Sequence, residues 1–146
     1  MLLAAGKGTR LKPLTEQWPK CLMPIGDRPL LEYWLETLRR AGIRTVMVNL
    51  HHQADSVRTF LRRLRFADWV ESVYETELLG TAGTLLSNSS FFQDCTTLLV
   101  HADNWCQCDF VDFLAVVIFM EHDRFQQLMM KHREKPRKNL KVGKLL

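Results

Sequence analysis

Cysteine, proline and glycine are all scarce in this chain, and their scarcity excludes several protein classes. The 146 residues include four cysteines, five prolines and seven glycines, too few for a disulfide-stapled, collagen-like or low-complexity sequence. No C-x-x-C pair is present, which argues against a zinc or redox motif, and no signal peptide is recognisable at the amino end. We therefore expect a cytoplasmic protein with reduced thiols. The cysteines are Cys21, Cys95, Cys106 and Cys108.

Long apolar runs are also missing. The longest spans residues 113–120, well short of the roughly 20 residues that a membrane-spanning helix needs. Hydrophobic residues nevertheless make up 47% of the chain, enough for one compact domain with a real core. We expect a globular protein that does not associate with a membrane.

The positive charge is concentrated at the carboxyl end. The formal net charge is +4, yet residues 131–146 hold seven of the 20 Lys and Arg and only one of the 16 Asp and Glu. An RNA-binding tail would release counterions on contact with phosphates, but this one has no aromatic side chain on which a base could stack. We divide the chain into residues 1–120, which carry the folded domain, and a basic carboxyl-terminal segment, 121–146. An RNA-associated domain is the least favoured interpretation, and no nucleic-acid partner is expected.

Strand-like and helix-like segments alternate along residues 1–120. Apolar runs at 2–5 and 45–50, the second rich in β-branched residues, predict buried strands. Residues 70–75 and 96–101 predict further strands, and residues 126–130 are an additional candidate. Helical spacing predicts helices at 30–38, bounded by Pro29 and Gly42, at 57–64, briefly at 83–87, and after an Asp109 cap. This order predicts an α/β fold, a Rossmann-like three-layer αβα domain with a mostly parallel sheet. Ligands of such folds bind at the carboxyl ends of the strands.

A glycine loop stands directly after the first predicted strand. Gly6 and Gly8, followed by Thr9, leave room for backbone N–H groups to close around a phosphate. A Walker A loop has a different spacing, and the dinucleotide fingerprint requires a third glycine where Leu11 stands. The loop is therefore a candidate phosphate cradle of another kind.

The glycine loop belongs to a longer string that resembles a known family. L-A-A-G-K-G-T-R-L-K-P-L-T at residues 3–15 is followed by P-K-C-L-M-P at 19–24. Both resemble the signature of the nucleoside-diphosphate-sugar pyrophosphorylases, and the likeness continues through segments 26–30, 49–52, 79–85 and 101–104. The G-T-A-G stretch at 80–83 is most similar to the mannose-1-phosphate guanylyltransferase and glucose-1-phosphate nucleotidyltransferase branches. The resemblance covers residues 2–114. It implies an Mg²⁺-dependent enzyme that joins an NTP to a sugar 1-phosphate and releases pyrophosphate.

The resemblance and the chemistry together assign catalytic and metal-binding roles. Nucleotidyl transfer requires cations that neutralise charge developing on phosphate oxygens. Arg10 offers a rigid fork for those oxygens and Lys20 a compact point charge, which the resemblance implies lies near the α-phosphate and the sugar phosphate. Asp103 follows the predicted strand at 96–101, where a hard carboxylate can hold Mg²⁺ against the triphosphate.

The resemblance also implies a set of nucleotide-binding residues. Glu75 aligns with a position that faces the nucleobase edge in related enzymes. Because a carboxylate only accepts hydrogen bonds, it suits the N–H donors of guanine better than the carbonyl acceptors of uracil or thymine; a solvent-facing Glu75 is the alternative. The expected nucleotide-binding residues are Leu3, Ala4, Ala5, Gly6, Gly8, Thr9, Glu75, Gly80 and Thr81.

The chain departs from the family in its length. Family enzymes are longer, and their second half supplies further sheet strands, a second metal-binding aspartate and most sugar contacts. The sequence shows no convincing match to that half, so both ends look cut and the domain looks truncated. Two alternatives therefore stay open: a non-catalytic nucleotide-binding remnant, and a cytidylyltransferase that acts on a non-sugar phosphate. A homo-oligomer is compatible with the sequence, which fixes neither the nucleobase nor the sugar.

Overall fold

The structure is a computed structural model that describes residues 1–93 and 95–118. The chain divides into two compact units, Met1–Gln107 and Cys108–Leu146, and each is described here by itself. The candidate strand at 126–130 and the basic segment 121–146 lie outside the described residues.

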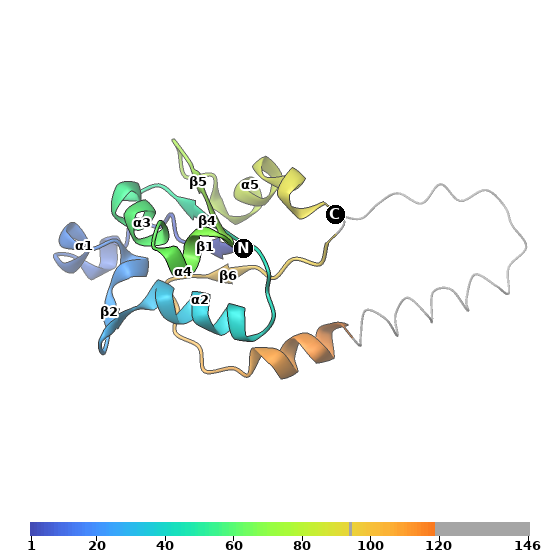
Figure 1. Cartoon of the computed structure of the whole chain (residues 1–146). Helices are drawn as coiled ribbons and strands as arrows, with labels where there is room; N and C mark the ends of the chain where they lie inside the picture. The colour runs from blue at the N-terminus through green and yellow to red at the C-terminus, as the bar shows by residue number, and fades with distance from the viewer. Residues whose placement is uncertain (94, 119–146) are drawn as a thin grey trace, which may run out of the picture. The chain divides into compact units, whose positions relative to one another are not determined.

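The first unit is built on a four-stranded parallel sheet with the order β5-β4-β1-β6 (Figure 1). Its strands are β1 (Leu2–Leu3), β4 (Val46–Leu50), β5 (Val70–Tyr74) and β6 (Val100–His101). Every residue of the central strand β4 is buried, as expected where helices cover both faces of a parallel sheet. The predicted α/β class with a parallel sheet is confirmed.

Strands β1 and β6 are shorter than the segments predicted for them. The chain leaves β1 after Leu3, because the glycine loop turns away from the sheet. β6 pairs with β1 alone among the described strands, and the ladder joins only Val100 and His101 of the predicted segment to Leu2 and Leu3. Two hydrogen bonds of Met1 precede this ladder: Val100 N donates to Met1 O at 2.9 Å, and Met1 N donates to Leu98 O at 2.5 Å.

Four helices connect these strands: α2 (Leu30–Arg40), α3 (Ala54–Leu61), α4 (Leu64–Ala67) and α5 (Gly80–Ser87). The chain moves from β1 to β4 to β5 in one direction along the sheet and then returns to β6 beyond β1. Right-handed crossovers put α2 and α3 on one face and α5 on the other. The direction of travel reverses between β1 and β6, which is where α/β folds bind their ligands.

Helix α2 begins and ends where the sequence predicts. Pro29 precedes its first turn, and Gly42 adopts the left-handed conformation just after it, with φ 81°. Leu31 and Leu35 on its inner face are completely buried, and burying a leucine side chain stabilises a fold by roughly 1.5–3 kcal/mol. On the same helix the buried Glu32 pairs with Arg65 at 2.7 Å, which joins α2 to α4.

The helix predicted at 57–64 is divided in two. Arg63 is extended, with ψ 140°, and separates α3 from α4. Leu64, which the helical pattern placed on the buried face, is 94% exposed. Phe66 and Trp69 fill the core at this point instead. The apolar residues keep their helical spacing through Leu64, although the backbone leaves the helical conformation at Arg63.

Short elements carry the chain from β1 to α2. They are the 3₁₀ helices η1 (Thr9–Leu11) and η2 (Lys20–Leu22), helix α1 (Leu14–Gln17), and the hairpin strands β2 (Pro24–Ile25) and β3 (Arg28–Pro29). Gly26 provides the positive φ, 65°, that the hairpin turn needs. A further 3₁₀ helix, η3 (Ser89–Phe92), follows α5.

The described part of the second unit is helical from residue 110 to residue 118. Asp109 accepts hydrogen bonds from the backbone N–H groups of Val111 and Asp112 at 2.9 and 3.2 Å, which is the N-cap that the sequence predicts. Among the described residues, no helix has both the length and the apolar character that a bilayer crossing requires.

Candidate functional site

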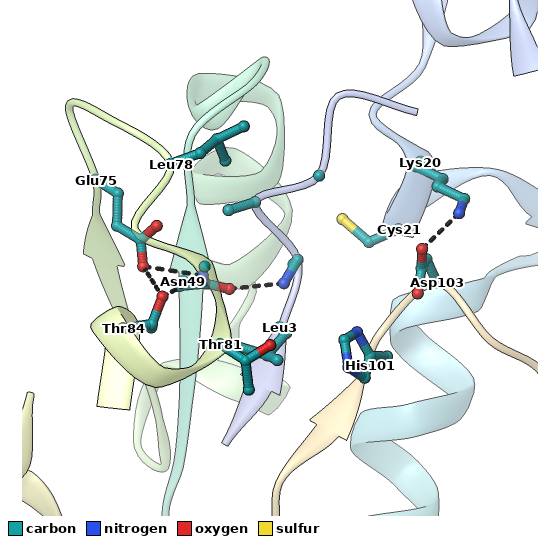
Figure 2. Close-up of a pocket in the computed structure, with 14 residues that line it drawn as sticks. Leu3, Lys20, Cys21, Asn49, Glu75, Leu78, Thr81, Thr84, His101 and Asp103 are labelled. Carbon is teal, nitrogen blue, oxygen red and sulfur yellow. Dashed lines mark hydrogen bonds and ion pairs between the residues drawn. The ribbon is translucent and has the colours of Figure 1, made fainter. Parts of the chain in front are cut away.

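A cleft of about 240 Å³ opens in the first unit at the carboxyl edge of the sheet (Figure 2). Its walls come from the ends of β1, β4 and β6, from η2 and from the first turns of α5. Nine of the twelve residues that the sequence singles out line it: Leu3, Ala4, Ala5, Gly6, Lys20, Glu75, Gly80, Thr81 and Asp103.

Strand register explains why these residues meet. Leu3 pairs with Asn49 on one side and with His101 on the other, so three strands end at the same level. Glu75 follows the last residue of β5, and Asp103 lies two positions beyond the end of β6. Polar side chains from distant parts of the sequence therefore converge on one edge of the sheet.

Lys20 and Asp103 form an ion pair on one side of the cleft. Lys20 Nζ lies 2.5 Å from Asp103 Oδ2, and the two side chains are 20% and 31% exposed. Figure 2 shows the two side chains pointing toward each other. The pair is partly shielded from water, so its charges are screened less than those of an exposed pair. Because both side chains are partly exposed, a ligand that enters the cleft can still replace the partner of either one.

The loop that carries Asp103 is held by α2. Trp34 Nε1 donates a hydrogen bond to the backbone carbonyl of Asn104 at 2.8 Å. Next along the chain, Trp105 packs edge-on against Tyr33, with ring centroids 5.0 Å apart. The loop beside Asp103 is therefore anchored to α2 at two consecutive residues.

Gly8, Thr9 and Arg10 lie outside the cleft lining. Gly8 has φ 62°, and a Cβ built on it would lie 2.7 Å from Thr15 Cγ2, so only glycine fits there. Thr15 Oγ1 also donates a hydrogen bond to Gly8 O at 3.0 Å. Arg10 is exposed and makes no ion pair within the described residues. The glycine loop is thus internally braced, and its arginine lies in solvent.

Glu75 is buried in a hydrogen-bonded network and does not face solvent. It is only 5% exposed. Its Oε1 accepts hydrogen bonds from Thr84 Oγ1 at 2.6 Å and from Asn49 Nδ2 at 3.0 Å, as Figure 2 shows. Its Oε2 is buried without a partner in the structure, and a polar atom left so is costly. The expectation that Glu75 lines the site fits this position, and the solvent-facing alternative is wrong.

Neighbouring residues also fix the backbone of Glu75. Its N–H donates to Leu50 O at 2.8 Å, and His51 Nδ1 lies 2.9 Å from its carbonyl oxygen, a geometry in which the ring nitrogen donates. The backbone and the side chain of Glu75 are therefore both held in place.

Cys21 contributes an uncharged thiol to the cleft. It is 1% exposed, and burial raises the pKa of its thiol to about 12, with the nearby Asp103 charge acting in the same direction. A thiol with that pKa stays protonated at neutral pH, so it adds no negative charge beside an anionic ligand.

Five lining residues were not among the expected site residues. They are Cys21, Asn49, Leu78, Thr84 and His101. One signal in the sequence could have identified Asn49, since it is a polar residue inside the otherwise apolar run of β4 and is only 3% exposed. Thr84 gives no such signal, because its role depends on how α5 packs.

Within the described residues no group of three or more His, Cys, Asp or Glu side chains could hold a metal ion. Asp103 nevertheless suits one metal in particular, because Mg²⁺ is usually held by one or two carboxylates while substrate phosphates and water complete its shell. The donor set fits an Mg²⁺ that arrives with a phosphorylated ligand.

A parallel α/β sheet with a glycine loop after its first strand, and with charged residues at its carboxyl edge, is typical of proteins that bind phosphorylated ligands at that edge. The chain belongs to the nucleotidyl transferase family, whose model matches residues 1–139. This confirms the resemblance seen in the motifs and extends the match beyond residue 114.

Curated relatives include enzymes that act on sugar 1-phosphates. A UTP–glucose-1-phosphate uridylyltransferase of Synechocystis is 36% identical over 115 residues, covering 70% of this chain and 30% of the relative. A mannose-1-phosphate guanyltransferase of Emericella nidulans is 33% identical over 114 residues, covering 75% of this chain and 31% of the relative. The chain thus spans about a third of the length of these relatives.

The fold has solved counterparts. The crystal structure of HddC from Yersinia pseudotuberculosis, complexed with GMP-PN, superimposes with a TM-score of 0.68 at 26% identity. The match covers 79% of this chain and 52% of that one.

Proposed function

We propose that the cleft binds a nucleoside triphosphate and that the chain is the nucleotide-binding part of an Mg²⁺-dependent sugar-1-phosphate nucleotidyltransferase. The observation that carries the proposal is the pairing of Lys20 with Asp103 in a cleft that begins at the glycine loop. One cation and one hard carboxylate, side by side, are what a metal-bound triphosphate requires. Family membership and the named sugar-1-phosphate relatives support it.

In this reaction a phosphate oxygen of the sugar 1-phosphate attacks the α-phosphorus in line. The bond from that phosphorus to the pyrophosphate oxygen breaks, and NDP-sugar and pyrophosphate result. The protein contributes mostly position and charge to such a transfer. Lys20 would neutralise the α-phosphate and the incoming sugar phosphate. Arg10, exposed at the end of the glycine loop, would fold onto the β- and γ-phosphates, with Gly6, Gly8 and Thr9 supplying backbone contacts.

Asp103 would hold Mg²⁺, which would screen the phosphate charges when bound. For this, Asp103 must share its carboxylate between Lys20 and the metal. Lys20 can release one carboxylate oxygen when it turns to a phosphate, because a phosphate oxygen replaces the partner that it loses.

The nucleobase would lie against Glu75, with Gly80 and Thr81 at the start of α5 allowing close approach and Leu3, Ala4 and Ala5 below it. Glu75 lines this end of the cleft, and its buried Oε2 has no hydrogen-bond partner among the described residues. An acceptor alone favours a base edge that presents N–H donors, which is the guanine pattern. GTP is therefore the proposed nucleotide.

The direct test is to incubate the chain with Mg²⁺, each of GTP, CTP, UTP, dTTP and ATP, and mannose 1-phosphate, glucose 1-phosphate or phosphocholine, and to measure pyrophosphate. Release with a sugar 1-phosphate supports the proposal, and release only with CTP and phosphocholine would replace it with cytidylyl transfer.

A second candidate function is nucleotide binding without turnover. The observation in its favour is that Arg10, the proposed phosphate-binding arginine, is exposed and lies outside the cleft lining. It predicts nucleotide binding with no pyrophosphate release from any pair of substrates, and failure of all five nucleotides to bind would exclude both functions.

A further inference from the structure

The side chain of Asn49 uses all of its hydrogen-bonding groups to connect two parts of the cleft. Its Oδ1 accepts the backbone N–H of Ala4 at 2.7 Å. Its Nδ2 donates to Glu75 Oε1 at 3.0 Å and lies 3.4 Å from Thr84 Oγ1. Asn49 thus joins the end of β1, where the glycine loop begins, to the buried carboxylate at the other end of the cleft.

The two carboxylate oxygens of Glu75 differ in their hydrogen-bond partners. Thr84 Oγ1 and Asn49 Nδ2 both donate to Oε1, which satisfies both of its lone pairs. Oε2 has no partner although the residue is 95% buried, since only 5% of it is exposed. Oε2 is therefore the one carboxylate oxygen of this cleft-lining residue that has no hydrogen-bond partner among the described residues.

We propose that Asn49 and Thr84 are positioning residues that set nucleobase selectivity. They hold Glu75 Oε1 so that Oε2 alone accepts the N–H donors of guanine. This inference rests on the proposed nucleotide-binding function and adds to it the residues that decide which base is bound. Neither residue needs to touch the nucleotide.

The same network fixes the distance between the base and the phosphates. Ala4 immediately precedes Ala5 and the loop glycine Gly6, and its N–H is bound to the amide that holds Glu75. A guanine on Oε2 is therefore held at a set distance from a triphosphate on the loop. Preorganisation of this kind improves affinity, because little ordering remains to be done on binding.

The first test measures equilibrium binding of GTP and UTP, each with Mg²⁺, to the full chain and its variants. Thr84→Val keeps the size of the side chain and removes the hydroxyl, while Thr84→Ser keeps the hydroxyl. We expect Thr84→Val to lower the ratio of GTP to UTP affinity about tenfold, the worth of one hydrogen bond to a charged group. Thr84→Ser restores the ratio, and Ser72→Ala on the exposed part of β5 leaves it unchanged.

A second variant tests the orientation that the network imposes. Because Thr84 and Asn49 both donate to Oε1, the amide of Glu75→Gln must place its oxygen there and its NH₂ group in the cleft. A donor in the cleft favours the carbonyl oxygens of uracil, so Glu75→Gln reverses the preference toward UTP. In the double variant Glu75→Gln/Thr84→Val, one of the two donors that fix the side-chain amide at position 75 is lost. The amide can then rotate so that its oxygen faces the cleft, and the preference for UTP over GTP becomes weaker.

The outcomes separate this inference from the proposed function. If the unaltered chain binds no nucleotide, both fail. If it binds GTP and UTP equally, or if Thr84→Val weakens both by the same factor, the inference is overturned and nucleotide binding stands. If Thr84→Val does not fold, the unaltered chain and Glu75→Gln still decide the matter: a retained GTP preference in Glu75→Gln overturns it, and a reversal supports it.

Discussion

Lys20 and Asp103 are 83 positions apart in the sequence, yet their side chains form an ion pair 2.5 Å long on one side of the cleft. Lys20 lies in the 3₁₀ helix η2 after the glycine loop, and Asp103 follows the edge strand β6. The fold therefore joins the beginning and the end of the first unit at a single pair of opposite charges. We propose that Lys20 binds the phosphates and that Asp103 binds Mg²⁺.

Substituting Lys20 should weaken nucleotide binding more than it weakens the fold. Lys20→Met removes one charge-assisted contact to phosphate, worth about 1.5–3 kcal/mol, so the Kd for Mg²⁺–GTP should rise roughly ten- to a hundredfold. Titration calorimetry measures it. Arg58→Met, which breaks an ion pair of 2.8 Å with Asp55 outside the cleft lining, is the matched control and should bind normally. Equal affinities for the two variants would contradict the role of Lys20.

Substituting Arg10 should affect ligand binding much more than stability, because its side chain is exposed and unpaired among the described residues. Arg10→Ala should change the free energy of unfolding by less than about 0.5 kcal/mol, as surface substitutions do. The same variant should weaken GTP binding about tenfold more than it weakens GMP binding, because only the triphosphate reaches the loop. Arg62→Ala, at the exposed residue that directly follows α3, serves as the control. A loss that is the same for GMP and GTP would exclude the proposed contact.

The two loop glycines should respond differently to alanine. Gly8→Ala forces a Cβ to within 2.7 Å of Thr15 at a φ of 62°, which should destabilise the fold by about 1–3 kcal/mol in a denaturant titration. A Cβ on Gly6 meets no atom within 4 Å, so Gly6→Ala should leave stability nearly unchanged. It should still reduce GTP affinity, because the methyl group occupies space that a phosphate needs. A Gly6→Ala variant with normal affinity would place the phosphates elsewhere.

Thiol labelling should distinguish Cys21 from the exposed cysteines. Burial raises its pKa to about 12, and only a thiolate reacts with iodoacetamide. At pH 8 the exposed Cys95, Cys106 and Cys108 should therefore be modified first, with Cys21 labelled only after denaturation. Because the folded-state pKa lies above the unfolded value near 9, the contribution of this thiol to stability is complete below pH 9 and is lost as the pH rises toward 12. Rapid labelling of Cys21 at pH 8 would contradict the burial seen here.

Much of the fold could be predicted from the sequence because its strands and helices carry strong local signals. An apolar run marks β4, and Pro29 and Gly42 bound α2. The break between α3 and α4 could not be predicted, because Arg63 leaves the helical conformation while the apolar spacing continues to Leu64. The short lengths of β1 and β6 likewise depend on which strands pair, and pairing is a long-range property.

The parts of the candidate site that belong to sequence motifs could be predicted, whereas the parts that depend on how distant elements pack together could not. Lys20 and Asp103 were expected in one cleft, and they meet there. The network of Asn49 and Thr84 around Glu75 joins three elements, so no short stretch of sequence reveals it. Gly8, Thr9 and Arg10 differ from the expectation, since the motif predicts them at the phosphates and the structure places them outside the cleft lining.

The most direct test of the account is the thermal unfolding of the full chain with Mg²⁺ and each of the five nucleoside triphosphates. A ligand that binds only the folded state at a hundred times its Kd stabilises that state by about 2.7 kcal/mol, which raises the melting temperature by several degrees for a domain of this size. We expect the largest increase with GTP and a much smaller one for Lys20→Met. If no triphosphate raises the melting temperature, the cleft is not a nucleotide site.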